Sequence, residues 1–438
     1  DVKNHSESKD KERNKKEMIS LSYCYNALFV GTPRIIRFYV KYLLYPFFVL
    51  PEELQDFVAL KERAGKKKAF KVAAPQTFVS SYNRDYQVLH DDINNVHKAD
   101  RIPSFASRAT TFFLIKLLCA FAAMMGSIHW TIGLSLLQFV FLPYSFPVAV
   151  IYGIQHILTL HIGSIVAFPA IEWTVNSLVP EYIVTALSIT ISPMFIICFL
   201  LVDQLLCVLL LFWNPMGKPK FPPIKRLMQS FVWGFLNCKS YFLILLPLCL
   251  GVRINLIAWV IDAVFGISAY VDLHLAFKRM EVTFYHVHRI GHLPFVYADS
   301  HKFHHYIHDT TPFDAHIFGS GAPEDWVALT NDILRASAGM VPSTFLPAVL
   351  KISWFNKFNY HSRVEADPFD EDNFHADHHA IPNVNFGAAY PFELLFGTVP
   401  AARKTEATFS GHRVTRVESE YNVTLKFSPL SEEGEKSE

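Results

Sequence analysis

Histidines gather in the second half of this chain at spacings that suit metal binding. Of its 20 histidines, 13 lie between His274 and His379. The segment HRIGH places His288 and His292 four residues apart, and two copies of the pattern HxxHH follow it. On an α-helix, residues three and four apart share a face, so each motif is expected to present its imidazoles together. Neutral imidazole binds iron, copper, zinc and nickel, and the pattern therefore predicts a metal site.

The number of these histidines indicates more than one metal ion. A structural zinc site takes four ligands and a catalytic one three, whereas eight imidazoles are present in the three motifs. Eight ligands divide naturally between two metals. Histidine without thiolate suits two non-haem irons that activate oxygen, with two zinc ions as the alternative. The eight residues are His288, His292, His301, His304, His305, His375, His378 and His379.

Long uncharged stretches indicate that the helices that position these histidines lie in a membrane. The chain has 438 residues, of which 51% are apolar, and its formal net charge of +1 gives no reason to expect a nucleic-acid partner. Residues 117–171 and 182–202 contain no Asp, Glu, Lys or Arg. Both stretches reach the roughly 20 residues that cross a bilayer core. The six cysteines show no CxxC spacing, so neither a disulfide framework nor a thiolate site is expected.

The apolar segments predict an all-α integral membrane protein with four to six transmembrane helices. Pro143 and Pro147 should break the first uncharged stretch into two crossings. The basic loop 217–226 should stay on the cytoplasmic or matrix-like side, and the histidine motifs, two crossings later, should form a helical cap on that same side. The further crossings are expected at 181–213, 230–251 and 254–278.

The remaining segments complete a four-part organisation. In the first part, Arg34, Arg37 and Lys41 share one face of an apolar segment at 27–50, which indicates a helix in the membrane interface, with a tilted span as the alternative. The four parts are a polar tail, interfacial helix and soluble cap at 1–108, transmembrane helices at 109–253, the histidine-rich domain at 254–400 and a polar C-terminal tail at 401–438.

The motifs together resemble the fatty acid hydroxylase/sterol desaturase superfamily, a group of membrane di-iron enzymes. The resemblance lies in EVTFYHVHRIGH, HKFHHYIHDTTPF, NYHSR and NFHADHHAIPNVNFGAAYPFELLFGT, and it covers residues 255–400. It implies that the eight motif histidines bind the metals and that His361 is a further ligand between the second and third motifs. Arg289 corresponds to the arginine that family members usually carry after the first histidine.

The chain departs from the family pattern at two places. Glu365 stands where some members carry a further histidine, and its carboxylate is a candidate oxygen ligand. Ala322, Pro323 and Glu324 stand where many members have His-Pro-Glu. The candidate additional ligands or outer residues of the site are His286, His308, His316, Glu365, Arg289 and Glu324.

The resemblance implies an enzyme that hydroxylates or desaturates a membrane lipid with O₂. Electrons must come from a donor such as cytochrome b5 or a ferredoxin, because no flavin or dinucleotide fingerprint is present. The endoplasmic reticulum is the expected location, with the mitochondrial inner membrane as the alternative. A second hypothesis is an accessory subunit of a large membrane complex that keeps the metal-binding fold, and a third is a zinc-dependent lipid hydrolase or transporter.

Overall fold

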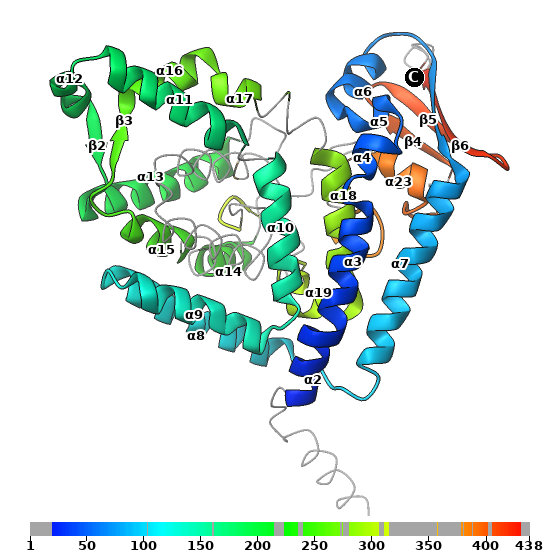
Figure 1. Cartoon of the computed structure of the whole chain (residues 1–438), viewed down its shortest axis with the longest axis horizontal. Helices are drawn as coiled ribbons and strands as arrows, with labels where there is room; N and C mark the ends of the chain where they lie inside the picture. Colours follow the sequence, from blue (N-terminus) through cyan, green and yellow to red (C-terminus); the bar gives the residue numbers. More distant parts are fainter. Residues whose placement is uncertain are drawn as a thin grey trace, which may run out of the picture.

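A computed structural model shows a largely helical chain with a small antiparallel sheet at one end (Figure 1). The prediction of an all-α fold is therefore wrong, although helices form most of the elements. The structure describes residues 20–102, 104–159, 162–213, 223–234, 240–271, 274, 280–305, 311–314, 357, 378–379, 381–387, 389–401 and 405–430.

The sheet joins segments from the two ends of the chain. Its strand order is β1–β6–β5–β4, and every neighbouring pair is antiparallel. Its strands are β1 (Phe70–Pro75), β4 (Glu406–Phe409), β5 (His412–Glu418) and β6 (Asn422–Pro429). Val423, Leu425 and Phe427 are buried and alternate with outward-facing residues, as in a sheet with one covered face. The expected polar tail at 401–438 is thus wrong for 406–429, because the polar residues between these apolar ones lower the average hydropathy and hide the alternation.

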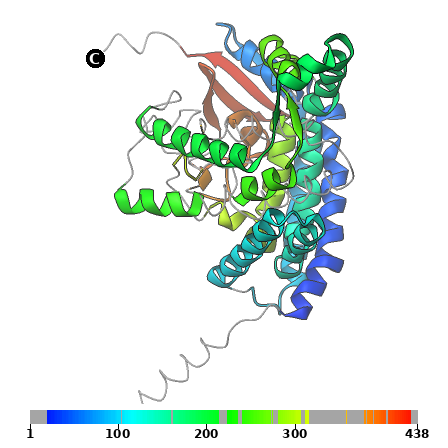
Figure 2. The ribbon, with the colours of Figure 1, turned by 90° about the vertical axis from the view of Figure 1, so that its left-hand side faces the viewer.

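Helices that share a hydrophobic core with the sheet form the remainder of what we call the sheet end. They are α2 (Leu21–Tyr25), η1 (Asn26–Gly31), α3 (Thr32–Leu43), α4 (Tyr45–Phe48), α5 (Glu52–Gln55), α6 (Phe57–Ala64), α7 (Gln76–Val96), α18 (Met280–Gly291), α19 (Pro294–Asp299) and α23 (Tyr390–Phe396). Helix α3 packs on α7, α10 and α18, and α23 contacts β4, β5 and β6. Figure 2 shows α2 and α3 along one edge of the molecule. Arg34 and Lys41 form ion pairs with Asp92 and Asp85 of α7, and the interfacial position of 27–50 stays a prediction.

The other helices form what we call the helical end. They are α8 (Phe105–Met124), α9 (Ile128–Phe141), α10 (Ser145–Thr159), α11 (Ile162–Leu178), α12 (Glu181–Ala186), α13 (Pro193–Phe212), α14 (Ile224–Gly234), α15 (Ser240–Leu248), α16 (Leu256–Phe265) and α17 (Ile267–Val271). The short strands β2 (Ser188–Thr190) and β3 (Arg253–Asn255) pair at its far edge (Figure 1). Helix α8 packs on α9 and α15, and α13 packs on α15.

Two of the described helices, α8 and α13, are long and apolar enough to cross a membrane. This is fewer than the four to six that we expected, because several apolar segments form shorter elements. The expected span 181–213 contains α12 and β2 before α13 begins. The expected span 254–278 yields α16, which ends at Gly266 with a left-handed φ of 61°. The break at Pro143 is confirmed, since it lies between α9 and α10, whereas Pro147 lies in the first turn of α10 and does not break that helix.

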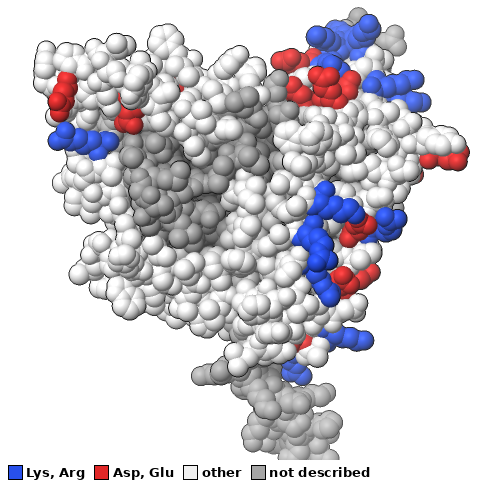
Figure 3. All heavy atoms as spheres, viewed as in Figure 1, with Lys and Arg blue, Asp and Glu red and all other residues white. Residues whose placement is uncertain are grey.

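The two ends of the molecule carry different surfaces. Figure 3 shows Lys, Arg, Asp and Glu over the sheet end and at the far edge of the helical end, with an uncharged surface between them. Large apolar side chains are exposed on the helices of the helical end, including Leu118, Trp130, Trp173, Leu201 and Val264. Exposed apolar side chains in this number fit association with a membrane, which the two long apolar helices also indicate.

Candidate metal centre

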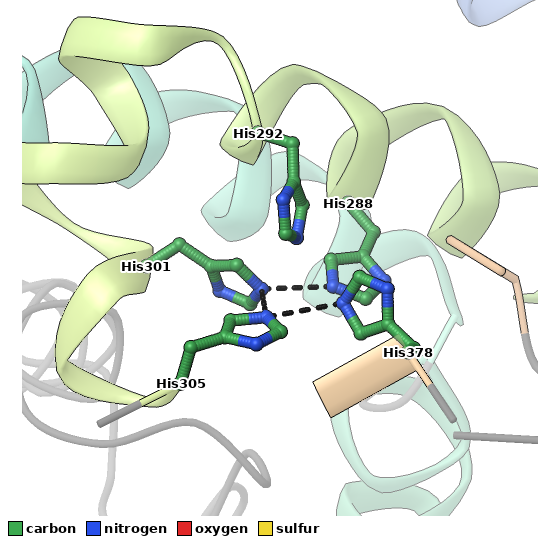
Figure 4. Close-up of side chains that lie close together, drawn as sticks. All are labelled: His288, His292, His301, His305 and His378. Carbon is green, nitrogen blue, oxygen red and sulfur yellow. Dashed lines mark hydrogen bonds between the residues drawn. The ribbon is translucent and has the colours of Figure 1, made fainter. Parts of the chain in front are cut away.

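Five buried histidines point toward one another at the centre of the site (Figure 4). They are His288, His292, His301, His305 and His378, and one ring nitrogen from each lies within 4.8 Å of all the others. Residues of all three sequence motifs are thus brought together. A buried cluster of five imidazoles can bind a metal ion.

Two short local structures orient four of these rings. His288 and His292 lie one turn apart on α18, as their spacing predicts. The second motif is not an α-helix, because His301–Phe303 forms a 3-10 turn after α19. The backbone N–H of His305 still donates to the carbonyl of His301 at 3.2 Å, and the two rings lie 4.6 Å apart. The prediction of a helix is wrong for this motif, but its rings share one side because the tight turn preserves the i to i+4 contact.

A chain of close contacts between Nε2 atoms links four of the histidines. Nε2 of His288 lies 2.8 Å from Nε2 of His301, which lies 2.9 Å from Nε2 of His305. Nε2 of His305 lies 3.1 Å from Nε2 of His378. The ring of His292 lies 4.6 Å from that of His301, and its buried Nε2 has no hydrogen-bond partner in the described part of the chain.

Two backbone carbonyls fix the tautomers at the ends of this chain of contacts. Nδ1 of His288 hydrogen-bonds to the carbonyl of Phe386, and Nδ1 of His378 hydrogen-bonds to the carbonyl of Val384. A carbonyl only accepts, so both Nδ1 atoms carry the proton in the neutral ring. The Nε2 atoms of both histidines therefore present lone pairs to the cluster.

Protons alone cannot satisfy the three Nε2 contacts. A ring nitrogen carries one proton at most, so His301 can donate to His288 and His305 can donate to His378. The contact between His301 and His305 would then set two N–H groups against each other at 2.9 Å. A cation bound by all the lone pairs removes this conflict, and the donor set thus fits a metal ion.

The nitrogens lie close enough together to bind one ion. With bonds of about 2.1 Å, neighbouring ligands of one metal lie about 3 Å apart. The three contacts of 2.8, 2.9 and 3.1 Å are close to this spacing. Five imidazoles also exceed the four ligands of structural zinc.

Burial favours the neutral form of three of the clustered imidazoles. Loss of hydration lowers the pKa of His288, His292 and His305 well below the usual value for histidine. Positive charge on neighbouring imidazoles would lower these pKa values further. Neutral imidazole is the form that binds a metal, because protonation occupies the lone pair. The site is therefore ready to bind without first losing protons at neutral pH.

Two more motif histidines lie beside the five. The ring centroid of His379 lies 4.4 Å from that of His304 and 4.5 Å from that of His305. Both His304 and His379 are buried. Six further candidates lie outside the described residues, namely His308, His316, Glu324, His361, Glu365 and His375.

The two remaining candidates, His286 and Arg289, contact neighbouring aromatic residues. Burial lowers the pKa of His286 to about 3, and its Nδ1 lies 2.8 Å from the hydroxyl of Tyr82. The guanidinium of Arg289 lies 4.3 Å from the ring centre of Tyr86 and donates to the hydroxyl of Tyr285 at 3.0 Å. Both side chains therefore belong to the packing around α18, and neither is among the five converging rings.

A buried carboxylate that sequence reasoning missed anchors the turn before His301. Asp299 accepts from the guanidinium of Arg108 at 3.0 Å, from the hydroxyl of Tyr23 at 2.8 Å and from the backbone N–H of Tyr144 at 3.2 Å. Burial raises its pKa to about 6, although Arg108 and the hydrogen bonds oppose the shift. These partners come from three distant segments, so no local spacing could have indicated them.

Comparison of the chain with protein-family models gives no match, and comparisons with curated proteins and with solved structures give none either. The resemblance to the fatty acid hydroxylase/sterol desaturase superfamily therefore remains a prediction from the motif residues.

Proposed function

We propose that this chain is a membrane-bound di-iron oxygenase that hydroxylates or desaturates a lipid, as members of the fatty acid hydroxylase/sterol desaturase superfamily do. The observation that carries the proposal is the convergence of five buried imidazoles, four of which are linked by Nε2 contacts that protons alone cannot satisfy. The apolar surface of the helical end supports a membrane setting for this site.

The histidines divide between two metal positions in this proposal. His288, His292, His301, His305 and His378 would hold one iron, and His304 and His379 would contribute to the second. The residues outside the described part that would complete the second position are His361, His375 and Glu365. Two irons of this kind supply the activation of O₂ and the oxidation of an unactivated C–H bond.

The chain itself supplies a dry, neutral and pre-arranged set of ligands. All five imidazoles are buried, and burial lowers the pKa of His288, His292 and His305, which favours the neutral form of these three rings. The carbonyls of Phe386 and Val384 hold two of the rings in the tautomer that binds metal. A lipid tail would reach the site from the apolar surface, and an external donor such as cytochrome b5 or a ferredoxin would supply electrons.

Two alternatives share the metal-binding fold. An accessory subunit of a membrane complex could keep the same ligands without turnover, and a zinc enzyme could use them for hydrolysis. The number of converging imidazoles, five, exceeds the four ligands of structural zinc and favours iron. The endoplasmic reticulum remains the proposed location, with the mitochondrial inner membrane as the alternative.

Metal analysis of the purified full-length protein, combined with a lipid oxidation assay, tests the proposal. We expect about two iron ions per chain and O₂-dependent oxidation of an added lipid. His305→Ala should abolish both, while His129→Ala, which changes an exposed histidine on α9, should leave both unchanged. A folded, metal-free protein would exclude both metal hypotheses, and bound iron without turnover in a protein that co-purifies with partners would favour the accessory subunit.

A further inference from the structure

One loop near the C-terminus orients two histidines of the cluster at once. The carbonyl of Val384 accepts from His378, and the carbonyl of Phe386, two residues later, accepts from His288. These histidines occupy the two ends of the chain of Nε2 contacts. Displacement of this loop would therefore release two ligands from their metal-binding tautomer.

The carboxylate of Glu393 on α23 holds this loop in place. Its Oε1 accepts from the backbone N–H of Gly387 at 2.5 Å, and its Oε2 accepts from the hydroxyl of Thr398 at 2.5 Å. The carbonyl of Thr398 in turn accepts from the backbone N–H of Asn385 at 2.9 Å. The loop is thus attached on both sides of Phe386, at Gly387 to Glu393 of α23 and at Asn385 to Thr398, which follows that helix.

The local conformation of the loop depends on the same contacts. Asn385 has a φ of 56°, in the left-handed region that Asn and Gly adopt more readily than other residues. A Cβ on Gly387 would lie 3.1 Å from Oε1 of Glu393, so a side chain at this position would crowd the carboxylate. The backbone approaches Glu393 this closely because residue 387 is a glycine.

The site around Glu393 is buried and connects to α18. Glu393 is fully buried, and burial raises the pKa of its carboxyl to about 7. The hydroxyl of Tyr285 lies 3.0 Å from that of Thr398 and accepts from Arg289 at 3.0 Å. Hydrogen bonds thus continue from Glu393 to Arg289, the residue that follows His288 along α18.

We propose that Glu393 is a positioning residue of the metal centre, because it holds the Val384–Gly387 loop whose carbonyls fix the tautomers of His288 and His378. This inference rests on the proposed metal site. Among the described residues, the hydrogen-bond partners of Glu393 are not metal ligands, so we expect its effect on metal binding to pass through the loop.

Titration with Co²⁺ tests this role, because the visible absorption of bound Co²⁺ reports the arrangement of its ligands. Glu393→Ala in the full-length protein should weaken Co²⁺ binding about 10- to 100-fold, the usual cost of losing an outer partner of a ligand, and should change the absorption of the bound ion. Glu393→Gln should have a smaller effect, because its amide oxygen can still accept from Gly387. The matched control is Glu406→Gln, which changes an exposed carboxylate on β4.

The outcomes separate this inference from the proposed metal site. If the unaltered protein binds no Co²⁺, the metal site itself is absent and the inference falls with it. If the unaltered protein binds Co²⁺ and Glu393→Ala binds it with the same affinity and spectrum, the positioning role is wrong while the metal site stands. Should Glu393→Ala fail to fold, the single variants Glu393→Gln and Thr398→Val replace it. Wild-type affinity and spectrum in both variants would overturn the inference.

Discussion

The sheet end and the helical end both have apolar interiors, yet their outer surfaces differ. At the sheet end, Phe70 stacks on Phe427 inside, with ring centroids 4.2 Å apart, while Lys71 and Lys426 face outward. At the helical end, Leu245 is fully buried while Leu205 on α13 is exposed. The comparison shows that the outer face, and not the core, indicates the solvent in which each part folds.

Buried polar groups also differ between the two ends. In α13 of the helical end, Asp203 forms an ion pair of 2.8 Å with Lys357, and both side chains are fully buried. At the sheet end, His286, Arg289 and Glu393 each have hydrogen-bond partners around α18. Charge in the apolar helix is thus neutralised by a direct partner, whereas the sheet end accommodates a wider polar network next to the metal centre.

The largest expected effect comes from placing a charge on the apolar surface. Leu205→Arg puts a guanidinium near the middle of α13, and in a bilayer this should cost about 2.5–3.5 kcal/mol. The measurement is the fraction of the protein that inserts into membranes during synthesis. Val417→Arg changes an exposed position of β5 and should cost less than about 0.5 kcal/mol, so the inserted fraction should stay the same. An equally small change in the inserted fraction for both variants would contradict a membrane setting for the helical end.

An intermediate effect is expected from acid on the buried histidine of the sheet end. The pKa of His286 is about 3 in the folded chain, against about 6.5 in an unfolded one. The unfolded state therefore binds this proton first, so stability falls by about 1.4 kcal/mol per pH unit as the pH drops from 6.5 toward 3.

Denaturant unfolding of the metal-free protein between pH 7 and pH 5 measures this loss. Over this interval His286→Phe should reduce the loss of stability by about 2 kcal/mol in total, because one titrating group is removed. His129→Ala, which changes an exposed histidine, should leave the slope unchanged. An unchanged slope in His286→Phe would show that His286 does not remain neutral in the folded chain.

The smallest expected effect lies on the outer face of the sheet. Lys71 and Lys426 are directly opposite in the β1–β6 pair, and like charges at such positions repel. Lys71→Glu should stabilise the protein by about 0.2–1 kcal/mol at low salt, and the gain should shrink as salt is added. Thermal unfolding at two salt concentrations measures it, with Lys66→Glu in the preceding turn as the control. A loss of stability would indicate that this face is not open to water.

Much of the candidate site could be predicted from the sequence because its signals are local. The spacing of His288 and His292 is set by the helical repeat, and the i to i+4 contact between His301 and His305 survives even in a tight turn. Uncharged stretches likewise predicted apolar helices, although only α8 and α13 of the described helices are long and apolar enough to cross a membrane. The tail at 401–438 was misjudged because average polarity concealed an alternating pattern.

The sequence by itself determined which residues could bind a metal and that long parts of the chain are apolar. Only the tertiary structure decided that β1 pairs with a strand some 350 residues away, and which carbonyls orient His288 and His378. It alone assigned Glu393 to the loop that carries those carbonyls. The physical reason is that side-chain spacing along one element is fixed by backbone geometry, whereas hydrogen-bond partners from distant segments are chosen only when the whole chain packs.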